Sequence, residues 1–276
     1  MTRDPDDERA EKWPLKAYKN PRFLASRDAR SVRMLAEFEE PKSRFARYDI
    51  SDTIVFFGSA RLLPRDVAEE RLAAARRHGG DTAAAERALA MSRYYEESRQ
   101  LASRLTEWSK GLKDPSRRFV VCTGGGPGVM EAANRGASEA KGLNVGLNIS
   151  IPHEQAANTH VTRELTFEFH YFFMRKFWFV YLAKAIVIFP GGFGTLDEFF
   201  EVLTLVQTRK LRKPMAIVLY GTPYWKEVLN LDAMVKHGTI DPPDLELFKS
   251  ADTVSDAFAY ITGRLEGVLP LPGASL

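Results

Sequence analysis

Short, continuous apolar runs separated by helical stretches make up most of the chain after residue 52. The apolar runs cover residues 53–57, 119–123, 144–149, 165–169, 185–189 and 215–220. Runs that do not alternate with polar residues are typical of strands buried on both faces, which means parallel strands between layers of helices. The stretches predicted as helical are 66–112 (interrupted near 78–81), 129–141, 171–183, 196–209, 224–237 and 255–266. This order predicts an α/β fold: a doubly wound, mostly parallel sheet of the Rossmann type with helices on both faces.

The first fifty residues follow a different pattern. They are rich in charged and aromatic side chains and are interrupted by Pro14, Pro21 and Pro41. Within them, residues 28–40 carry apolar side chains at three-residue spacing, which predicts a short amphipathic helix. We therefore expect two parts: residues 1–50 as a helical N-terminal extension that packs on the main domain or on a second subunit, and residues 51–276 as a Rossmann-like domain.

Composition narrows the class of protein. The 276 residues are 45% apolar and 27% charged, and the net charge is +3 with acidic and basic side chains interleaved. Since no basic stripe is concentrated anywhere, a nucleic-acid partner is not expected. The most apolar long run, 167–188, contains several charged residues, which argues against a membrane span.

Other residue types point to the cytoplasm and against a metal site. The single cysteine, Cys122, lies in an apolar run and is expected to be a core residue of a protein from a reducing compartment. The charged N-terminus lacks the apolar core of a signal peptide, so we expect a cytoplasmic protein. The five histidines show no ligand spacing, and no metal is expected.

In an open parallel sheet, ligands bind beyond the carboxyl ends of the strands, so the residues that follow each strand are the informative ones. The first such turn runs Thr123-Gly124-Gly125-Gly126-Pro127-Gly128 into a helix. Bare glycine backbone allows close approach of a ligand, and amides at a helix start favour an anion. The same turn also fits tight packing of strand on helix, and the residues leave that alternative open.

The second turn is Pro190-Gly191-Gly192-Phe193-Gly194-Thr195, again between an apolar strand and a helix. The amides of Gly191, Gly192 and Gly194 and the hydroxyl of Thr195 form a phosphate cradle in outline. No Lys-Ser or Lys-Thr pair follows, so this is not a Walker loop, and the dinucleotide spacing is absent too. Glu198, one turn into the helix, would be unfavourable beside a phosphate but suits a position facing the sugar. The alternative interpretation of Glu198 is an acidic side chain that only stabilises the first turn of its helix.

A third candidate follows the first strand, in Gly58-Ser59-Ala60-Arg61. Ser59 either donates to a phosphate or a base, or caps the next helix.

Taken together, these turns resemble the LOG ("Lonely Guy") family of cytokinin-activating proteins and their bacterial relatives, which often carry the label lysine decarboxylase. The resemblance spans residues 53–229. It depends on four elements in the family's order: Gly58-Ser59, the Gly124-Gly125-Gly126 turn with Val129-Met130-Glu131, the helix with Met174-Arg175-Lys176, and Pro190-Gly191-Gly192-x-Gly194-Thr195-x-x-Glu198. Residues 1–50 and the helical insertion 66–112 are absent from the plant members, so the sequence is more similar to the longer bacterial branch.

The resemblance implies a phosphoribohydrolase that converts a nucleoside 5′-monophosphate (AMP-like) and water into free base and ribose 5-phosphate. It implies Arg175 and Glu198 as the catalytic pair, no organic cofactor, and a homodimer or higher homo-oligomer with sites near the subunit interface. The phosphate-binding positions that it implies are Gly191, Gly192, Gly194 and Thr195. Further candidate substrate-binding positions lie on the other matched elements: Ser59, Gly125, Gly126, Gly128, Met130, Glu131 and Lys176.

The chemistry is consistent with these roles. Breaking a ribosyl–base bond builds positive charge on the sugar, which a carboxylate such as Glu198 can stabilise while it orients water. An arginine does not act as a proton donor, so Arg175 is expected to bind the phosphate or hold negative charge on the leaving base. The rival hypothesis is a non-catalytic nucleotide sensor or molybdenum-cofactor carrier of the same fold, which needs the cradle but no carboxylate at the sugar. A decarboxylase is disfavoured because no cofactor-binding lysine motif is recognisable. The base preference stays open.

Overall fold

A computed structural model describes residues 14–113, 118–150 and 157–266. The chain divides into two compact units, Met1–Ser43 and Arg44–Leu276, which we describe separately. In the first unit, η1 (Ala17–Lys19) and α2 (Pro21–Leu24) precede α3 (Arg30–Arg47), which continues into the second unit. Asn20 caps α2 by accepting a hydrogen bond from the amide of Phe23 at 3.1 Å.

Helix α3 continues beyond the predicted end at residue 40. Pro41 lies inside it, although an interior proline removes one hydrogen bond and usually ends a helix. The residues after Pro41 supply the reason for the longer helix. Phe45 packs on Phe167 and Trp178, with ring centroids 5.1 and 5.3 Å apart, and these contacts favour a helical course through Arg47.

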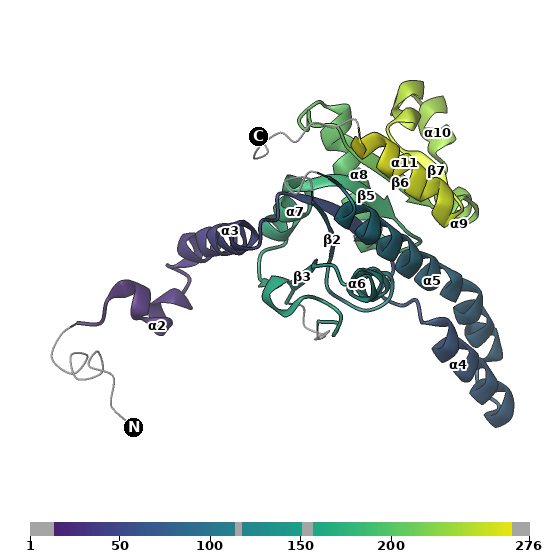
Figure 1. Cartoon of the computed structure of the whole chain (residues 1–276), viewed down its shortest axis with the longest axis horizontal. Coiled ribbons are helices and arrows are strands. Elements are labelled where there is room, and N and C mark those ends of the chain that lie inside the picture. The colour runs from purple at the N-terminus through teal and green to yellow at the C-terminus, as the bar shows by residue number, and fades with distance from the viewer. Residues whose placement is uncertain (1–13, 114–117, 151–156, 267–276) are drawn as a thin grey trace. The chain divides into compact units, whose positions relative to one another are not determined.

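The second unit is built on a sheet of seven parallel strands, which confirms the predicted fold class (Figure 1). The strands are β1 (Asp52–Phe57), β2 (Phe119–Thr123), β3 (Asn144–Ile149), β4 (Thr166–Phe169), β5 (Ala183–Ile188), β6 (Ala216–Tyr220) and β7 (Lys249–Ala251). Their order across the sheet is β4-β3-β2-β1-β5-β6-β7. The chain therefore winds outward in one direction from β1 to β4 and in the other from β5 to β7. Strand β7 was not predicted, because its three residues at the sheet edge carry no apolar run.

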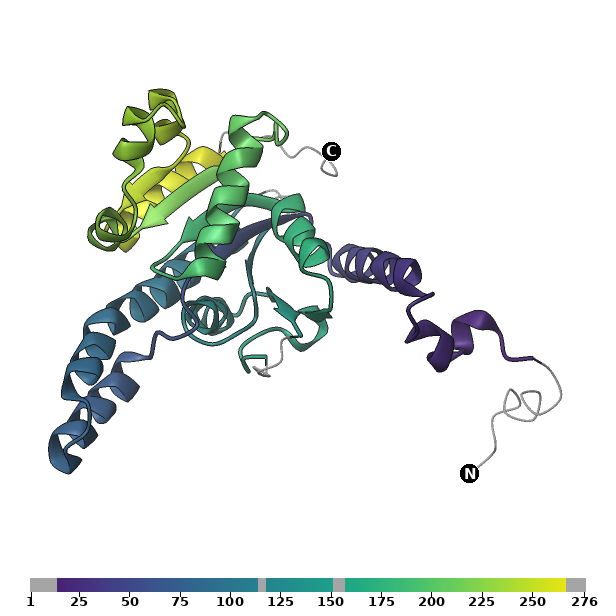
Figure 2. The ribbon, with the colours of Figure 1, turned by 180° about the vertical axis from the view of Figure 1, so that it is seen from behind.

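Helices cover both faces of the sheet. Helices α5, α6 and α11 lie on one face of the sheet (Figure 1). Helices α7 and α8 lie on the opposite face, which is turned toward the viewer in Figure 2. The helices and short 3₁₀ turns of the second unit are α4 (Arg65–His78), α5 (Thr82–Lys110), α6 (Val129–Glu139), η2 (Arg163–Leu165), α7 (Phe172–Tyr181), α8 (Phe193–Gln207), α9 (Thr222–Val228), α10 (Leu231–Lys236), η3 (Pro242–Glu246) and α11 (Val254–Glu266). None of the described helices is long and apolar enough to span a bilayer.

Two helical boundaries follow from local chemistry. The break predicted near 78–81 is confirmed: Gly79 ends α4 with a φ of 71°, and Asp81 caps α5 by accepting from the Ala84 amide at 2.8 Å. The single helix predicted over 224–237 is wrong. Helix α9 ends at Val228. The side chain of Asn230 caps the start of α10 by accepting from the Ala233 amide at 3.0 Å, and this cap favours two short helices over one continuous helix.

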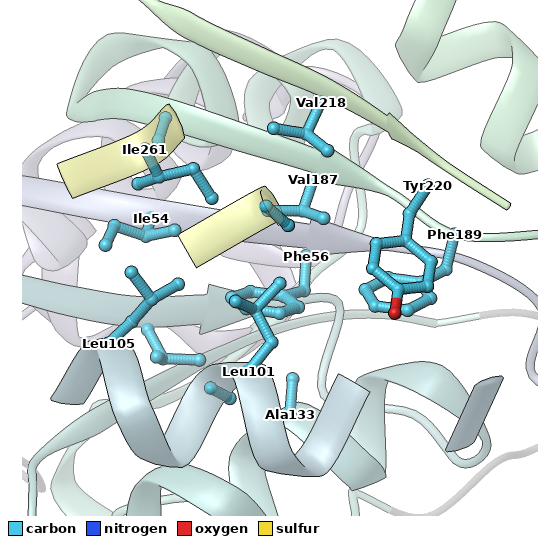
Figure 3. Close-up of a cluster of buried hydrophobic side chains, with 14 of the residues drawn as sticks. Ile54, Phe56, Leu101, Leu105, Ala133, Val187, Phe189, Val218, Tyr220 and Ile261 are labelled. Atoms are coloured by element: carbon cyan, nitrogen blue, oxygen red, sulfur yellow. The ribbon is translucent and has the colours of Figure 1, made fainter. Parts of the chain in front are cut away.

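The main core lies between the sheet and helices α5, α6 and α11 (Figure 3). Ile54 and Phe56 of β1 face Leu101 and Leu105 of α5, and all four are fully buried. Alternate residues of the same strand point to the opposite face, where the Phe57 ring meets Phe179 of α7 edge-on at 4.9 Å. Strand β1 is thus fixed from both sides, which sets the position of the loop that follows it.

Candidate active site

The sheet order places the site. Strands β1 and β5 are neighbours at the point where the winding direction reverses, and in doubly wound sheets a crevice opens there beyond the strand ends. The segments that leave these two strands are residues 58–62 and 190–195. Both line one cavity of about 650 Å³, a size typical of small-molecule sites.

The turn after β5 carries free amides. Helix α8 begins at Phe193, three residues before the predicted start, with Gly192 as its N-cap. Its first helical hydrogen bond runs from the Leu196 amide to the Gly192 carbonyl at 3.0 Å, so the earlier amides of the turn are left for a ligand. Gly191 is required for close packing, because a Cβ there would collide with Oγ1 of the buried Thr195. Gly191, Gly192, Gly194 and Thr195 all line the cavity, and their binding of a phosphate stays a prediction.

The loop after β1 connects the glycine turns. The Ser59 amide donates to the Pro190 carbonyl at 3.0 Å, and the Ser59 carbonyl accepts from the Val129 amide at 3.1 Å. Ser59 lines the cavity, and its hydroxyl accepts from the Arg61 amide at 3.1 Å. Of the two alternatives, the helix cap is wrong, because α4 starts later and has Pro64 at its N-cap.

The turn after β2 contributes less to the cavity than its glycines suggest. Gly124 and Met130 line it, and the other candidates from this turn do not. Gly125 has a φ of 70°, and its carbonyl accepts from the amide of Asn158 at 2.8 Å. Gly128, with a φ of 71°, packs so closely on Ser59 and Ala60 that no Cβ fits.

The remaining candidates of this region act in packing as well. The side-chain amide of Asn158 donates to the carbonyls of Gly125 and Gly126, both at 3.0 Å. Glu131 accepts a hydrogen bond from the Tyr95 hydroxyl at 2.8 Å. The structure therefore places Gly125, Gly126, Gly128 and Glu131 in the support of the turn rather than on the cavity wall.

Glu198 and Arg175 line the cavity from two different helices. Glu198 of α8 is 5% exposed, and its Oε2 has no hydrogen bond in the described part of the chain. Burial raises the pKa of this carboxyl to about 7, against the lowering effect of Lys176. Arg175 of α7 has a buried Nε that is likewise unbonded, and its guanidinium lies 5.1 and 5.5 Å from the ring centroids of Phe172 and Phe179. A buried carboxyl and a half-buried guanidinium, each with a buried polar atom that makes no hydrogen bond, are typical of a site that awaits a polar ligand.

Lys176, the neighbour of Arg175, has a different environment. Its ammonium lies 2.6 Å from Glu201, 2.8 Å from Asp197 and 3.7 Å from Glu198. Burial alone would lower the pKa of Lys176, but these hydrogen bonds outweigh it and the pKa is raised. Lys176 lines a neighbouring groove along α8 and not the cavity, so its contact with the site passes through Glu198.

Several cavity residues escaped the sequence analysis. Met91 lies in α5, Leu62 lies in the loop that leads to α4, and Tyr224 and Val228 belong to α9. Tyr224 had a usable signal, since it follows β6 at the same carboxyl edge of the sheet. Met91 had none, because it lies mid-helix in a segment whose place is set only by tertiary packing.

With this geometry in place, known proteins supply a comparison. The chain matches the family model described as "Possible lysine decarboxylase" over residues 130–261. It is 29% identical over 155 residues to "Probable cytokinin riboside 5'-monophosphate phosphoribohydrolase LOGL5" of Oryza sativa subsp. japonica, covering 55% of this chain and 60% of that protein. It is 28% identical over 168 residues to "Cytokinin riboside 5'-monophosphate phosphoribohydrolase LOG7" of Arabidopsis thaliana, covering 59% and 71%.

Among solved structures, the molybdenum cofactor binding protein from the phototrophic bacterium Rippkaea orientalis is similar with a TM-score of 0.46 and 16% identity, covering 76% of this chain and 94% of that one. The chain spans less than two thirds of the length of the rice protein.

Proposed function

On the basis of the similarity of the chain to the LOG family, we propose that it hydrolyses the N-glycosidic bond of a nucleoside 5′-monophosphate to give a free base and ribose 5-phosphate. One observation carries the proposal. A buried carboxyl and a half-buried guanidinium, each with a buried polar atom that makes no hydrogen bond, line the same cavity as a helix N-terminus with free amides. A phosphate-binding protein needs the amides, whereas a glycosidase also needs the acid.

The reaction follows from the roles of three groups. The α8 N-terminus and its glycine turn bind the 5′-phosphate, and this binding energy holds the ribose against Glu198 one turn further along the helix. As the C1′–N bond breaks, its electron pair leaves with the base and positive charge grows on the sugar, where the Glu198 carboxylate stabilises it. The oxygen of a water forms the new C1′–O bond, one of its protons passes to the carboxylate, and the base takes up a proton from solvent as it leaves. Glu198 then returns its proton to solvent, so the sum of the steps consumes one water and leaves the enzyme unchanged. Arg175 offsets negative charge on the phosphate or on the departing base.

A lysine decarboxylase of the pyridoxal type would need a lysine facing the site. Among the described residues, no lysine lines the cavity. Lys176 is engaged by three carboxylates, and Lys184 pairs with Asp52 at 3.3 Å at the amino ends of β5 and β1, opposite to the cavity. These placements favour the hydrolase over the decarboxylase named in the family description.

We also propose a homodimer that uses the outer face of α8. A groove of about 500 Å³ runs along this helix between Phe193, Leu196, Phe200 and Leu205. Phe193 is 93% exposed, although it adjoins the cavity. An exposed apolar surface beside a site is typical of a face that a second chain covers.

The proposed reaction is tested with purified protein and a panel of AMP, GMP, CMP, UMP and N6-isopentenyl-AMP, followed by detection of free base at pH 8.5. We expect cleavage of at least one of them. Glu198→Gln, which keeps the shape of the side chain, lowers kcat by about 100-fold or more with little change in ribose 5-phosphate affinity.

Glu201→Gln is the matched control, one turn away on the same helix and outside the cavity, and it keeps near-parental turnover at this pH. Tight binding without cleavage of any monophosphate would favour the carrier or sensor hypothesis instead.

A further inference from the structure

Within the described residues, one side-chain hydrogen bond holds the second glycine turn from outside. The hydroxyl of Tyr224, on α9, donates to the carbonyl of Gly191 at 2.9 Å. One residue earlier, the carbonyl of Pro190 accepts from the Ser59 amide at 3.0 Å. Two consecutive peptide groups of the turn are thus fixed through their oxygens, by two segments that lie far apart in the sequence.

These bonds decide where the amides point. Both peptides are trans, and in a planar trans peptide the N–H lies opposite to the C=O. The Ser59 bond therefore orients the N–H of Gly191, and the Tyr224 bond orients that of Gly192. Neither amide donates a hydrogen bond within the described part of the chain, so both are available to a ligand.

The contacts of helix α9 fix the position of Tyr224. Its N-cap Gly221 has a φ of 91°, and the Gly221 amide donates to the Ala251 carbonyl at 2.8 Å. Trp225 is buried and donates from its ring nitrogen to the Tyr220 carbonyl at 2.9 Å, and its ring meets that of Tyr224 edge-on at 4.9 Å. Burial raises the pKa of Tyr224, so its hydroxyl stays protonated and remains a donor at neutral pH.

We propose that Tyr224 is a positioning residue for the 5′-phosphate: through the Gly191 carbonyl it turns the Gly192 amide toward the bound anion. This inference rests on the proposed function for the identity of the ligand. Tyr224 touches no reacting atom in this role. Its hydroxyl acts on the peptide group, while its ring forms part of the cavity wall.

Tyr224→Phe removes the hydroxyl and keeps the ring, and a net hydrogen-bond contribution corresponds to a factor of about three to ten in affinity. We expect the Kd for ribose 5-phosphate, measured by titration calorimetry, and the KM for AMP to rise by this same factor while kcat stays within about twofold. Inhibition by adenosine, which enters the same cavity without a phosphate, should be unchanged. It also reports whether the cavity is intact in the variant. Tyr260→Phe, on α11 and outside the cavity, is the control and should change none of these values.

Unchanged ribose 5-phosphate binding by Tyr224→Phe would overturn the assignment. So would an equal loss for ribose 5-phosphate and adenosine, which would mark a structural role. If the parental protein cleaves no monophosphate but the variant still binds ribose 5-phosphate selectively more weakly, the hydrolase proposal fails and the role of Tyr224 stands. A parental protein that binds no ribose 5-phosphate overturns both.

Discussion

At the scale of single residues, the site depends on how four charged side chains act on one buried carboxyl, that of Glu198. Glu198 is surrounded by Lys176 and Arg175, which lower the pKa of its carboxyl, and by Glu201 and Asp197, which raise it. Burial is the largest effect: it outweighs the lowering by the two cations, and the pKa of Glu198 is raised to about 7. Because the proposed reaction needs the carboxylate, its protonation state controls activity near neutral pH.

We predict that kcat/KM rises with pH and reaches half of its maximum near pH 7, since Glu198 must lose its proton in the free enzyme. Lys176→Met removes the cation 3.7 Å away and leaves nearby carboxylates unbalanced, so the midpoint shifts upward by roughly half a pH unit or more. Glu201→Gln removes a like charge, and its midpoint shifts downward. Opposite shifts in pH–rate profiles would confirm the charge assignment, and shifts in the same direction would contradict it.

At the scale of elements, close helix contacts position the turns that form the site. Helix α6 starts at the turn after β2 and packs on α5, which contributes Met91 to the cavity. The contact is close because Gly136 of α6 lies against the backbone of Arg99, where a Cβ would collide with the carbonyl oxygen. A salt bridge of 2.7 Å between Arg99 and Glu139 flanks it, but both side chains are partly exposed and such pairs contribute little.

We predict that Gly136→Ala destabilises the protein by about 1–3 kcal/mol, because the added methyl must push α5 away. Gly263→Ala is the matched control, since Gly263 also lies within a helix, α11, and nothing lies within 4 Å of its added Cβ. It should stabilise the protein by about 0.5–1 kcal/mol through the better helix propensity of alanine. Thermal unfolding measures both, and equal effects of the two substitutions would refute the packing argument.

At the scale of the whole molecule, the open question is assembly. The groove on α8 would be covered in the proposed homodimer, and the cavity that contains Glu198 adjoins it through Phe193 and Leu196. Dimerisation would thereby limit access of water to the site. The proposal predicts that sedimentation velocity finds a dimer at micromolar concentration.

Thr204→Arg tests this interface. Thr204 is exposed and lines the groove, so an arginine there leaves the monomer folded but obstructs a second chain, and we expect a shift to monomer. Val67→Arg, which changes an exposed apolar residue of α4, should leave the dimer intact. A variant at Thr204 that sediments like the parental protein would argue against the α8 face.

Much of the fold was readable from the sequence because its signals are local. Continuous apolar runs gave six of the strands, and the strand-to-helix order implied parallel pairing. The glycine turn of residues 190–195 and Glu198 were found in the same way, since the carboxyl ends of parallel strands converge at one edge of the sheet.

Tertiary structure decided what those local signals could not. Both glycine turns look alike in sequence, yet Gly191, Gly192 and Gly194 of the second line the cavity, while the Gly125 and Gly126 carbonyls of the first are bonded to Asn158 and these two residues lie outside it. Arg175 and Lys176 are adjacent along the chain, but consecutive side chains of a helix point in different directions. Arg175 therefore lines the cavity, whereas Lys176 contacts three carboxylates. Tyr224 and Met91 reach the site only because α9 and α5 pack where they do. Residue type and spacing determine which groups can do chemistry, but the direction in which each points depends on packing between segments that are distant in the sequence.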